Sequence, residues 1–174
     1  MHRRLKVIAL ILLVAGCATA ASVNDSASHV SVTFVEPEKF TDARRAELEP
    51  TSKGVLGELQ NFIVKTGTRY VPENMRLNIK VTNVDLAGDF ELFRGPQADQ
   101  VRISKGLYPP HIVLDFELVD SDGSVIKSGT RDLTDINYQL RSVSPREDAL
   151  RYEKDILRDW LRSEFNGVNG RTVG

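Results

Sequence analysis

The chain has 174 residues, of which 23 are Lys or Arg and 24 are Asp or Glu, so its formal net charge is −1. This length favours a single domain that buries enough surface to fold without a metal or a disulfide. A content of 41% hydrophobic and 27% charged residues excludes a disordered chain or a coiled coil, and the balanced charge argues against a nucleic-acid-binding module.

The first residues have the three-part pattern of a bacterial export signal. Three basic side chains lie among the first six residues, and the uncharged run from Val7 to Ala15 follows them. These nine apolar residues are too few for a membrane-spanning helix, which needs about 20. We therefore predict a signal peptide over residues 1–16. The alternative is an N-terminal membrane anchor that stays attached.

Two cleavage signals overlap after the apolar run. Val14-Ala15-Gly16-Cys17 resembles the lipobox of bacterial lipoproteins, in which the cysteine becomes the lipid-bearing first residue of the mature chain. Ala18-Thr19-Ala20 has instead the form of an ordinary signal-peptidase site, with cleavage before Ala21. Cys17 is the only cysteine in the chain and lies directly after the run, so the pattern favours lipidation.

Lipidation of Cys17 would connect the protein to a membrane. In bacterial lipoproteins, which this segment resembles, Ala18 instead of Asp after the cysteine implies sorting to the outer membrane. We therefore expect an outer-membrane lipoprotein that faces the periplasm, with a flexible tether over residues 17–29. The alternative is a soluble periplasmic protein that begins at Ala21. The folded part contains no cysteine, so it cannot form a disulfide.

Residues 30–166 predict one α+β domain, which a loose tail over residues 167–174 follows. Apolar and polar side chains alternate along the predicted strands. The phase of one strand slips near Asn83, where we expect a bulge or a strand end. The predicted strands lie at residues 30–34, 75–81, 90–92, 101–103 and 112–119.

Apolar residues at helical spacing predict a first helix, with Thr51 or Ser52 as its N-cap. Gly67 ends this helix, and we place it at the C′ position. Gly54 and Gly57 lie inside the helix, and we attribute both to close packing on the sheet rather than to a ligand site. Each glycine costs about 1 kcal/mol relative to alanine in a helix.

A second helix has a marked start near the end of the chain. Ser144 is the predicted N-cap, Pro145 the first helical residue, and Glu147 completes a capping box. Its apolar stripe includes Trp160, the sole tryptophan, which we expect in the core. Two amphipathic helices need one shared sheet face to cover. We therefore predict a two-layer α+β sandwich, with a mostly antiparallel sheet of four to five strands and both helices packed on one face.

A β-hairpin is the best-specified unit of the chain. Ser121-Asp122-Gly123 suits a three-residue loop with glycine in the left-handed position. The register that we predict places Leu118 opposite Ile126, because a slip by one residue would set it against Lys127. The two aspartates near the loop, at 120 and 122, weakly resemble a calcium loop, but the turn explains both without calcium.

The sequence contains no known catalytic motif, and we expect no enzyme, no metal and no cofactor. Only His29 and His111 remain after export, which makes a weak case for a metal site, and we interpret His111 as a rim residue. A hydrolase would need two carboxylates that converge in a cleft. The candidates for that alternative are Asp85, Asp89, Asp115 and Glu117.

A surface for partner binding is the more promising interpretation. We interpret Asp115 and Glu117 as a solvated charge ladder opposite Lys127 and near Arg131, with a polar binding surface as the alternative. Aromatic residues in loop-rich stretches either fold inward or form an exposed apolar edge, which would mark an interaction site. The candidate interaction surface consists of Phe90, Phe93, Tyr108, Asp115 and Glu117.

Several segments resemble a family of small exported proteobacterial proteins. The segment from Val32 to Asp42 resembles the opening of that family. The other matching segments are Asp85-Leu86-Ala87-Gly88, Pro109-Pro110, Tyr152-Glu153-Lys154 and Asp159-Trp160. The similarity spans about residues 30–166, and the family is the domain-of-unknown-function family three-thousand-and-sixteen. It has no assigned activity, so the resemblance implies no catalytic residue.

These observations predict a non-enzymatic envelope protein that binds or assembles with another envelope protein, and that does not bind nucleic acid. A lipid at Cys17 would hold it on the membrane. The alternative is a periplasmic carrier or sensor for a small or lipidic ligand, which would lie between the helices and the sheet and would need a sizeable apolar cavity.

Overall fold

The computed structural model describes residues 28–42, 52–90, 102–103, 105–141, 145 and 147–168. The predicted signal peptide, Cys17, Phe93 and Ser144 lie outside these residues. No helix within the described ranges has the length and apolar character that crossing a bilayer requires. The elements are β1 (Val30–Phe34), η1 (Pro37–Lys39), α1 (Ser52–Gly67), β2 (Arg76–Asp85), β3 (Asp89–Phe90), β4 (Arg102–Ile103), β5 (His111–Val119), β6 (Val125–Thr134), α2 (Tyr138–Arg141) and α3 (Arg151–Phe165).

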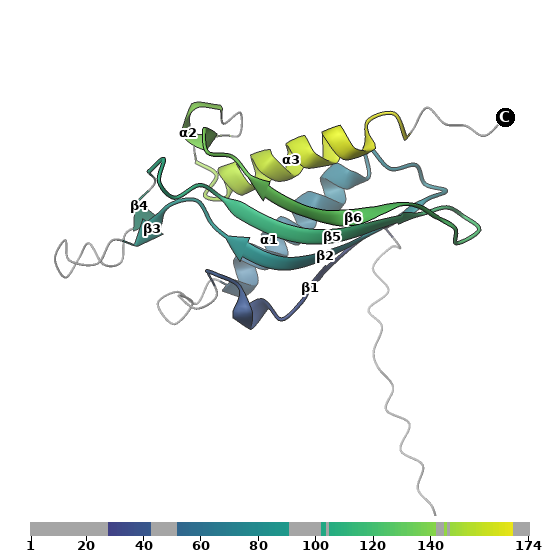
Figure 1. The fold of residues 1–174 in the computed structure, drawn as a ribbon, viewed down its shortest axis with the longest axis horizontal. Coiled ribbons are helices and arrows are strands. Elements are labelled where there is room, and N and C mark those ends of the chain that lie inside the picture. Colours follow the sequence, from purple (N-terminus) through teal and green to yellow (C-terminus); the bar gives the residue numbers. More distant parts are fainter. Residues whose placement is uncertain are drawn as a thin grey trace, which may run out of the picture.

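Four strands form the main sheet in the order β1-β2-β5-β6, and the two long helices α1 and α3 cover one face of it (Figure 1). β5 pairs antiparallel with both β2 and β6, whereas β1 pairs parallel with β2. The parallel pair arises because α1 crosses between β1 and β2 and returns the chain in the same direction. The predicted two-layer α+β sandwich is confirmed, with a mixed sheet. β3 and β4 form a separate two-stranded pair.

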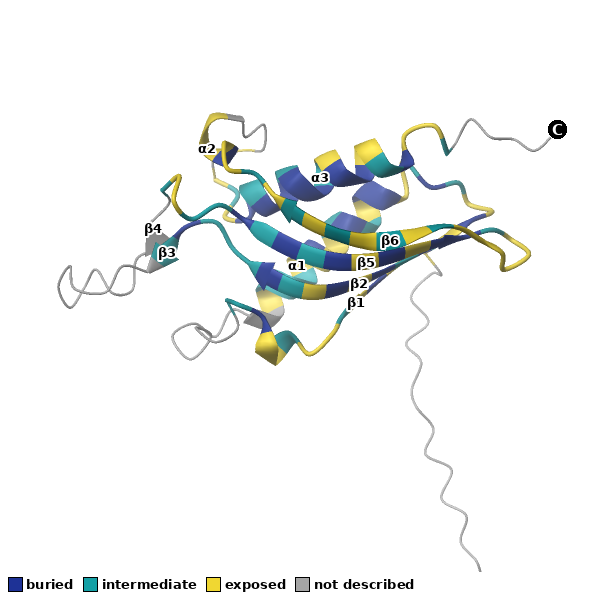
Figure 2. Ribbon diagram, in the orientation of Figure 1, coloured by how far each residue is buried: buried dark blue, intermediate teal, exposed yellow. Residues whose placement is uncertain are grey.

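The core lies between the helices and the inner face of the sheet. Buried and exposed residues alternate along β2 and β5 (Figure 2), as the period of two predicts. The rings of Phe116, Trp160 and Phe165 meet edge to face, with centroids 5.6–5.8 Å apart. Trp160 is 4% exposed, so its predicted place in the core is confirmed.

The predicted bulge in β2 is also confirmed. The register with β5 shifts between Val81 and Asn83, and both Val81 and Val84 remain buried on the inner face. The side-chain oxygen of Asn83 accepts hydrogen bonds from the backbone N–H and the hydroxyl of Thr41, at 2.9 and 3.2 Å. The bulge therefore connects the end of β2 to the segment after η1.

The predicted hairpin loop is confirmed, but the register beyond it was wrong. Gly123 has a left-handed φ of 86°, and Val119 pairs with Val125 across the loop. A bulge then sets Leu118 opposite Lys127, so Ile126 is 42% exposed instead of facing the core. Lys127 therefore turns toward the helix layer, where a partner on α3 compensates its charge.

Glu164 on α3 is that partner, and it also binds Arg131. Arg131 donates two hydrogen bonds to the Glu164 carboxylate, at 2.7 and 2.8 Å, and Lys127 lies 2.6 Å from it. The hydrogen bonds from Arg131 lower the pKa of Glu164 below its ordinary value, against the opposing effect of burial. Charges that point inward also protect an edge strand such as β6 from pairing with another chain.

The final helix begins later than predicted. α3 starts at Arg151, while Pro145 and residues 147–150 are not helical. The predicted start at Pro145 was wrong because Asp148 organises a turn there instead: its side chain accepts the N–H of Leu150 at 2.9 Å and its carbonyl accepts that of Arg151 at 3.2 Å.

The glycines of α1 have different roles from those predicted. A Cβ on Gly54 or Gly57 would meet no atom within 4 Å, so close packing does not explain either residue. Gly67 is the glycine under packing constraint, since a Cβ there would lie 3.2 and 3.3 Å from the two methyl groups of Val30. Gly67 is the last helical residue and has no left-handed φ, so its assignment to C′ was wrong.

Candidate functional site

The described members of the predicted interaction surface fall in two places. Asp115 and Glu117 are exposed on the sheet face that the helices leave uncovered. Tyr108 is half-buried in the turn before β5, at the end of the sheet. The side chain of Phe90 and the whole of Phe93 lie outside what the structure describes.

The predicted charge ladder on the uncovered face was wrong. The register shift turns Lys127 and Arg131 to the opposite face, so Asp115 pairs with Thr130 instead and accepts its hydroxyl hydrogen bond at 2.5 Å. On its other side Asp115 lies opposite Lys80 of β2. The uncovered face therefore carries dispersed charges of both signs among small polar side chains.

The hydrolase candidates lie on three different strands: Asp85 on β2, Asp89 on β3, and Asp115 and Glu117 on β5. Asp85 lies opposite His111 in the β2–β5 pair, and His111 Nε2 lies 2.7 Å from an Asp132 oxygen. Asp115 lies four residues further along β5. Within the described ranges, no cluster of three or more His, Cys, Asp or Glu side chains is arranged to hold a metal ion.

A surface feature that the sequence analysis missed lies at the same end of the sheet as Tyr108. Leu107, Ile136 and Leu140 are 77%, 70% and 89% exposed, more than any other large hydrophobic side chain that the structure describes. We call these three residues the apolar tip. Single exposed aliphatic residues are ordinary, but a group of them on neighbouring segments is informative.

Two short turns carry Leu107 and Ile136, and α2, which follows the second turn, carries Leu140. Tyr108 N–H donates to the Lys105 carbonyl at 2.9 Å, which places Leu107 in the middle of a turn. Tyr138 N–H donates to the Asp135 carbonyl at 3.2 Å, which places Ile136 in the same situation. The middle of a turn favours Gly, Pro, Asn or Asp for reasons of backbone geometry. Local structure therefore gives no reason for aliphatic side chains there.

Tyr138 joins the two turns to each other and to α3. Its side chain is 2% exposed, and its hydroxyl donates to the Lys105 carbonyl at 2.6 Å. Its ring meets that of Tyr152 edge to face, with the centroids 4.5 Å apart. The Arg151 guanidinium lies 4.3 Å from the centroid of the Tyr152 ring. The contact between Tyr138 and Tyr152 thus packs α2 against the first turn of α3, and Figure 1 shows α2 beside the start of that helix.

Two carboxylates fix the segment that follows β2, and we call them the carboxylate clamp. Asp42 accepts a hydrogen bond from the N–H of Leu86, and Glu153 accepts one from the N–H of Ala87 at 2.6 Å. Glu153 is 1% exposed and lies in the first turn of α3, where the helix dipole favours a negative charge.

Gly88 continues this arrangement toward the apolar tip. It has a left-handed φ of 84°, and its N–H donates to the Tyr108 carbonyl at 2.9 Å. The clamp and this hydrogen bond bring together the end of β2, the turn before β5 and the first turn of α3. Two of the segments that carry the family resemblance, 85–88 and 152–154, are therefore in contact, and a third, 109–110, directly follows Tyr108.

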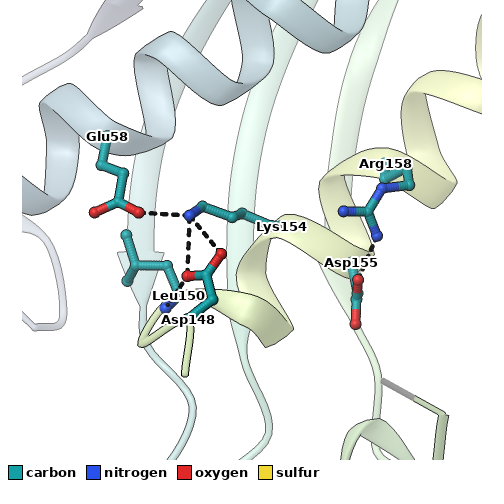
Figure 3. Close-up of polar contacts among 6 residues, drawn as sticks. All are labelled: Glu58, Asp148, Leu150, Lys154, Asp155 and Arg158. Atoms are coloured by element: carbon teal, nitrogen blue, oxygen red, sulfur yellow. Dashed lines mark hydrogen bonds and ion pairs between the residues drawn. The ribbon is translucent and has the colours of Figure 1, made fainter. Parts of the chain in front are cut away.

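Lys154, next to Glu153, is buried and forms a charge cluster with the more exposed Glu58 and Asp148 (Figure 3). Its ammonium group lies 2.7 and 2.9 Å from the two Asp148 oxygens, and Glu58 approaches it from α1. Burial alone would lower the pKa of Lys154, but the hydrogen bonds to Asp148 and Glu58 outweigh this and raise its pKa above the ordinary value. This cluster, the Lys154 triad, connects α1 to the turn before α3.

The fold and the site together define a small α+β domain with an exposed apolar tip. Residues 28–163 match the family model described as "Protein of unknown function (DUF3016)", and the chain belongs to this family, as its motifs predicted. No curated protein matches the chain. Among solved structures, a minor lipoprotein from Acinetobacter baumannii is similar at 10% identity over 81% of this chain and 91% of that chain. Its TM-score of 0.26 is too low to assign a shared fold or function.

Proposed function

We propose that this protein is an outer-membrane lipoprotein, anchored through Cys17, that acts by binding a protein partner with its apolar tip. The exposure of Leu107, Ile136 and Leu140 carries the proposal. Aliphatic side chains that are 70–89% exposed add little to folding, and grouped on contacting turns they mark an interaction site. In many interfaces a few side chains that insert into the partner supply most of the binding energy.

The mounting of the tip supports a binding role. Tyr138 and the carboxylate clamp hold both turns before any partner arrives, so little ordering remains for the moment of binding. A preorganised surface loses less conformational entropy on association than a mobile one, and its affinity rises accordingly.

The packing of the domain interior favours binding at the surface over a ligand held inside. The aromatic rings of Phe116, Trp160 and Phe165 contact one another between α3 and the sheet, where a carrier would hold its ligand. We therefore propose the partner-binding function ahead of the carrier or sensor.

Site-specific photo-cross-linking in living cells tests the binding role. A photoreactive phenylalanine analogue at Leu140 is expected to give a discrete heavier product. The same analogue at Val125, which is 55% exposed at the far hairpin, is the matched control and is expected to give none. Equal cross-linking at both positions, or none at either, would contradict the proposal.

Mass spectrometry of the protein extracted from its own membranes tests the anchor. We expect a mature chain that begins at a lipid-modified Cys17. A chain that begins at Ala21 would contradict the anchor and would leave the binding role to be judged on cross-linking alone.

A further inference from the structure

We infer that the apolar tip is presented away from the anchoring membrane and fits a concave aliphatic pocket on a protein partner, and not the bilayer or a second copy of this chain. This inference rests on the proposed function and deepens it. Three observations carry it: where the chain enters the domain, the charge of the mature protein, and the shape of the tip.

The chain enters the folded domain at the end opposite the tip. The His29 carbonyl accepts the N–H of Leu77 at 2.8 Å, and Leu77 in turn pairs with Leu118 near the end of β5. Leu107 precedes His111, the first residue of β5, which pairs with Thr134 just before Ile136. At about 3.3 Å per residue, the seven steps from Leu118 back to His111 separate the two ends by roughly 23 Å.

Cys17, the proposed anchor, lies twelve residues before His29 in the sequence, so the lipid would be attached on the side of the domain that is opposite the tip. Figure 1 shows α2, which carries Leu140, at the other end of the sheet from the start of β1.

The charge of the mature chain also disfavours a bilayer as the occupant. Cleavage before Cys17 removes three positive and no negative side chains, which changes the formal charge from −1 to −4. Anionic lipids attract basic surfaces and give an acidic domain no reason to lie down on the membrane.

The shape of the tip favours a pocket over a flat or symmetric contact. Side chains that are 70–89% exposed project from the surface, so the matching surface must be concave. Two projecting tips cannot enclose each other, so a symmetric tip-to-tip contact would not bury these side chains. A pocket on another protein excludes water from all three side chains at once.

Fluorescence quenching in vesicles tests the orientation. The full lipidated chain, with Leu140→Cys labelled by an environment-sensitive dye, is placed in phosphatidylethanolamine–phosphatidylglycerol vesicles that contain a lipid-borne nitroxide. Cys17 is the only native cysteine, and its sulfur carries the lipid, so the dye reacts only with the new thiol. Ser28→Cys, where the chain enters the domain, is the matched position. We expect stronger quenching at 28 than at 140, and the reverse order would overturn the inference.

Cross-linking from position 140 in cells tests the occupant. We expect a product with a different protein whose yield falls at least about fivefold when Leu107→Asp or Ile136→Asp is added, but not when Ile126→Asp is added. Ile126 is 42% exposed near the far hairpin and controls for the added charge. A product of twice the 19.4 kDa chain, less the cleaved segment, identifies a second copy and overturns the inference.

The two experiments distinguish a failure of this inference from a failure of the proposed binding function. Absence of any specific product from position 140 refutes the proposed binding role and the inference together. A specific product combined with strong lipid quenching at 140 keeps the binding role and refutes only the orientation.

Discussion

Replacement of Lys154 by methionine tests how much the Lys154 triad contributes to the stability of the domain. The Lys154 side chain is 11% exposed, and its ammonium group contacts Asp148 and Glu58. Methionine keeps the length and apolar stem of the side chain near Phe62 but removes the charge. The substitution therefore leaves two carboxylates close together without the cation that they share.

The expected cost follows from the burial of each partner. Loss of one member of a fully buried ion pair costs about 3–5 kcal/mol, whereas an exposed pair contributes about 0.2–1 kcal/mol. Asp148 is 21% exposed, so its pair with Lys154 resembles a buried ion pair. Glu58 is 55% exposed, so its pair with Lys154 resembles an exposed one. We therefore expect the free energy of unfolding to fall by about 2–3 kcal/mol, between these limits. For a domain of this size the melting temperature should fall by roughly 6–12 °C.

Arg162→Met on the same helix is the matched control. Arg162 contacts Asp159 at 2.9 Å, but the two side chains are 62% and 50% exposed, so the same loss of charge should cost at most about 0.5 kcal/mol. Urea and thermal unfolding followed by circular dichroism measure both variants. If both variants lost the same free energy of unfolding, burial would not explain the contribution of the Lys154 triad to stability.

The pH dependence of the same variant gives an independent check. The pKa of Lys154 is raised in the folded state, so its contribution to stability is complete below the ordinary lysine value of about 10.4 and is lost as pH rises through the folded value. The difference between wild type and Lys154→Met should therefore stay constant from pH 7 to 9. It should shrink only in strongly alkaline solution.

Three further predictions test the rest of the frame. Because the pKa of Glu164 is lowered in the folded state, its carboxylate stabilises the fold at pH values above the ordinary glutamate pKa of about 4.3, and this contribution is lost as the pH falls through the folded pKa. In urea unfolding, Glu164→Gln should therefore lower stability at pH 7 and make no difference near pH 2. Gly54→Ala and Gly57→Ala should each raise the free energy of unfolding by about 0.5–1 kcal/mol, because their Cβ atoms meet open space; Gly67→Ala should show no such gain. Tyr138→Phe should lower stability by about 1 kcal/mol and weaken cross-linking from position 140, because the hydrogen bond that joins the two turns is lost; undiminished cross-linking would show that the turns keep their positions without it.

The sequence predicted features that depend on local periodicity and turn chemistry. Alternation in β2 and β5 indicated the inner face of the sheet, the phase slip located the bulge at Asn83, and Gly123 identified the hairpin loop. In each case the deciding interaction lies within a few residues along the chain, or follows from the single rule that apolar side chains face the core.

The failures occurred where a partner distant in sequence decides the local structure. Lys127 and Arg131 face inward because Glu164 lies 37 and 33 residues further on, a contact that strand alternation cannot reveal. The start of α3 moved because Asp148 forms a turn and binds Lys154 instead of joining a helix. The apolar tip was missed for the opposite reason: an exposed leucine and a buried one look alike in a sequence, and only the packing of neighbouring segments distinguishes them.

The two consecutive buried charges at the start of α3 are best understood as positional devices. Glu153 binds the segment after β2, and Lys154 binds the turn before α3 and α1, so the first turn of the helix is held from two sides. Buried ion pairs are weak contributors to net stability, because desolvation offsets much of their attraction. Their main effect is to exclude alternatives, since any shift of this turn would leave a buried charge without its partner. Tyr152 stands on the same turn and meets Tyr138 edge to face, so the hypothesis of a preorganised apolar tip follows from the placement of these charges.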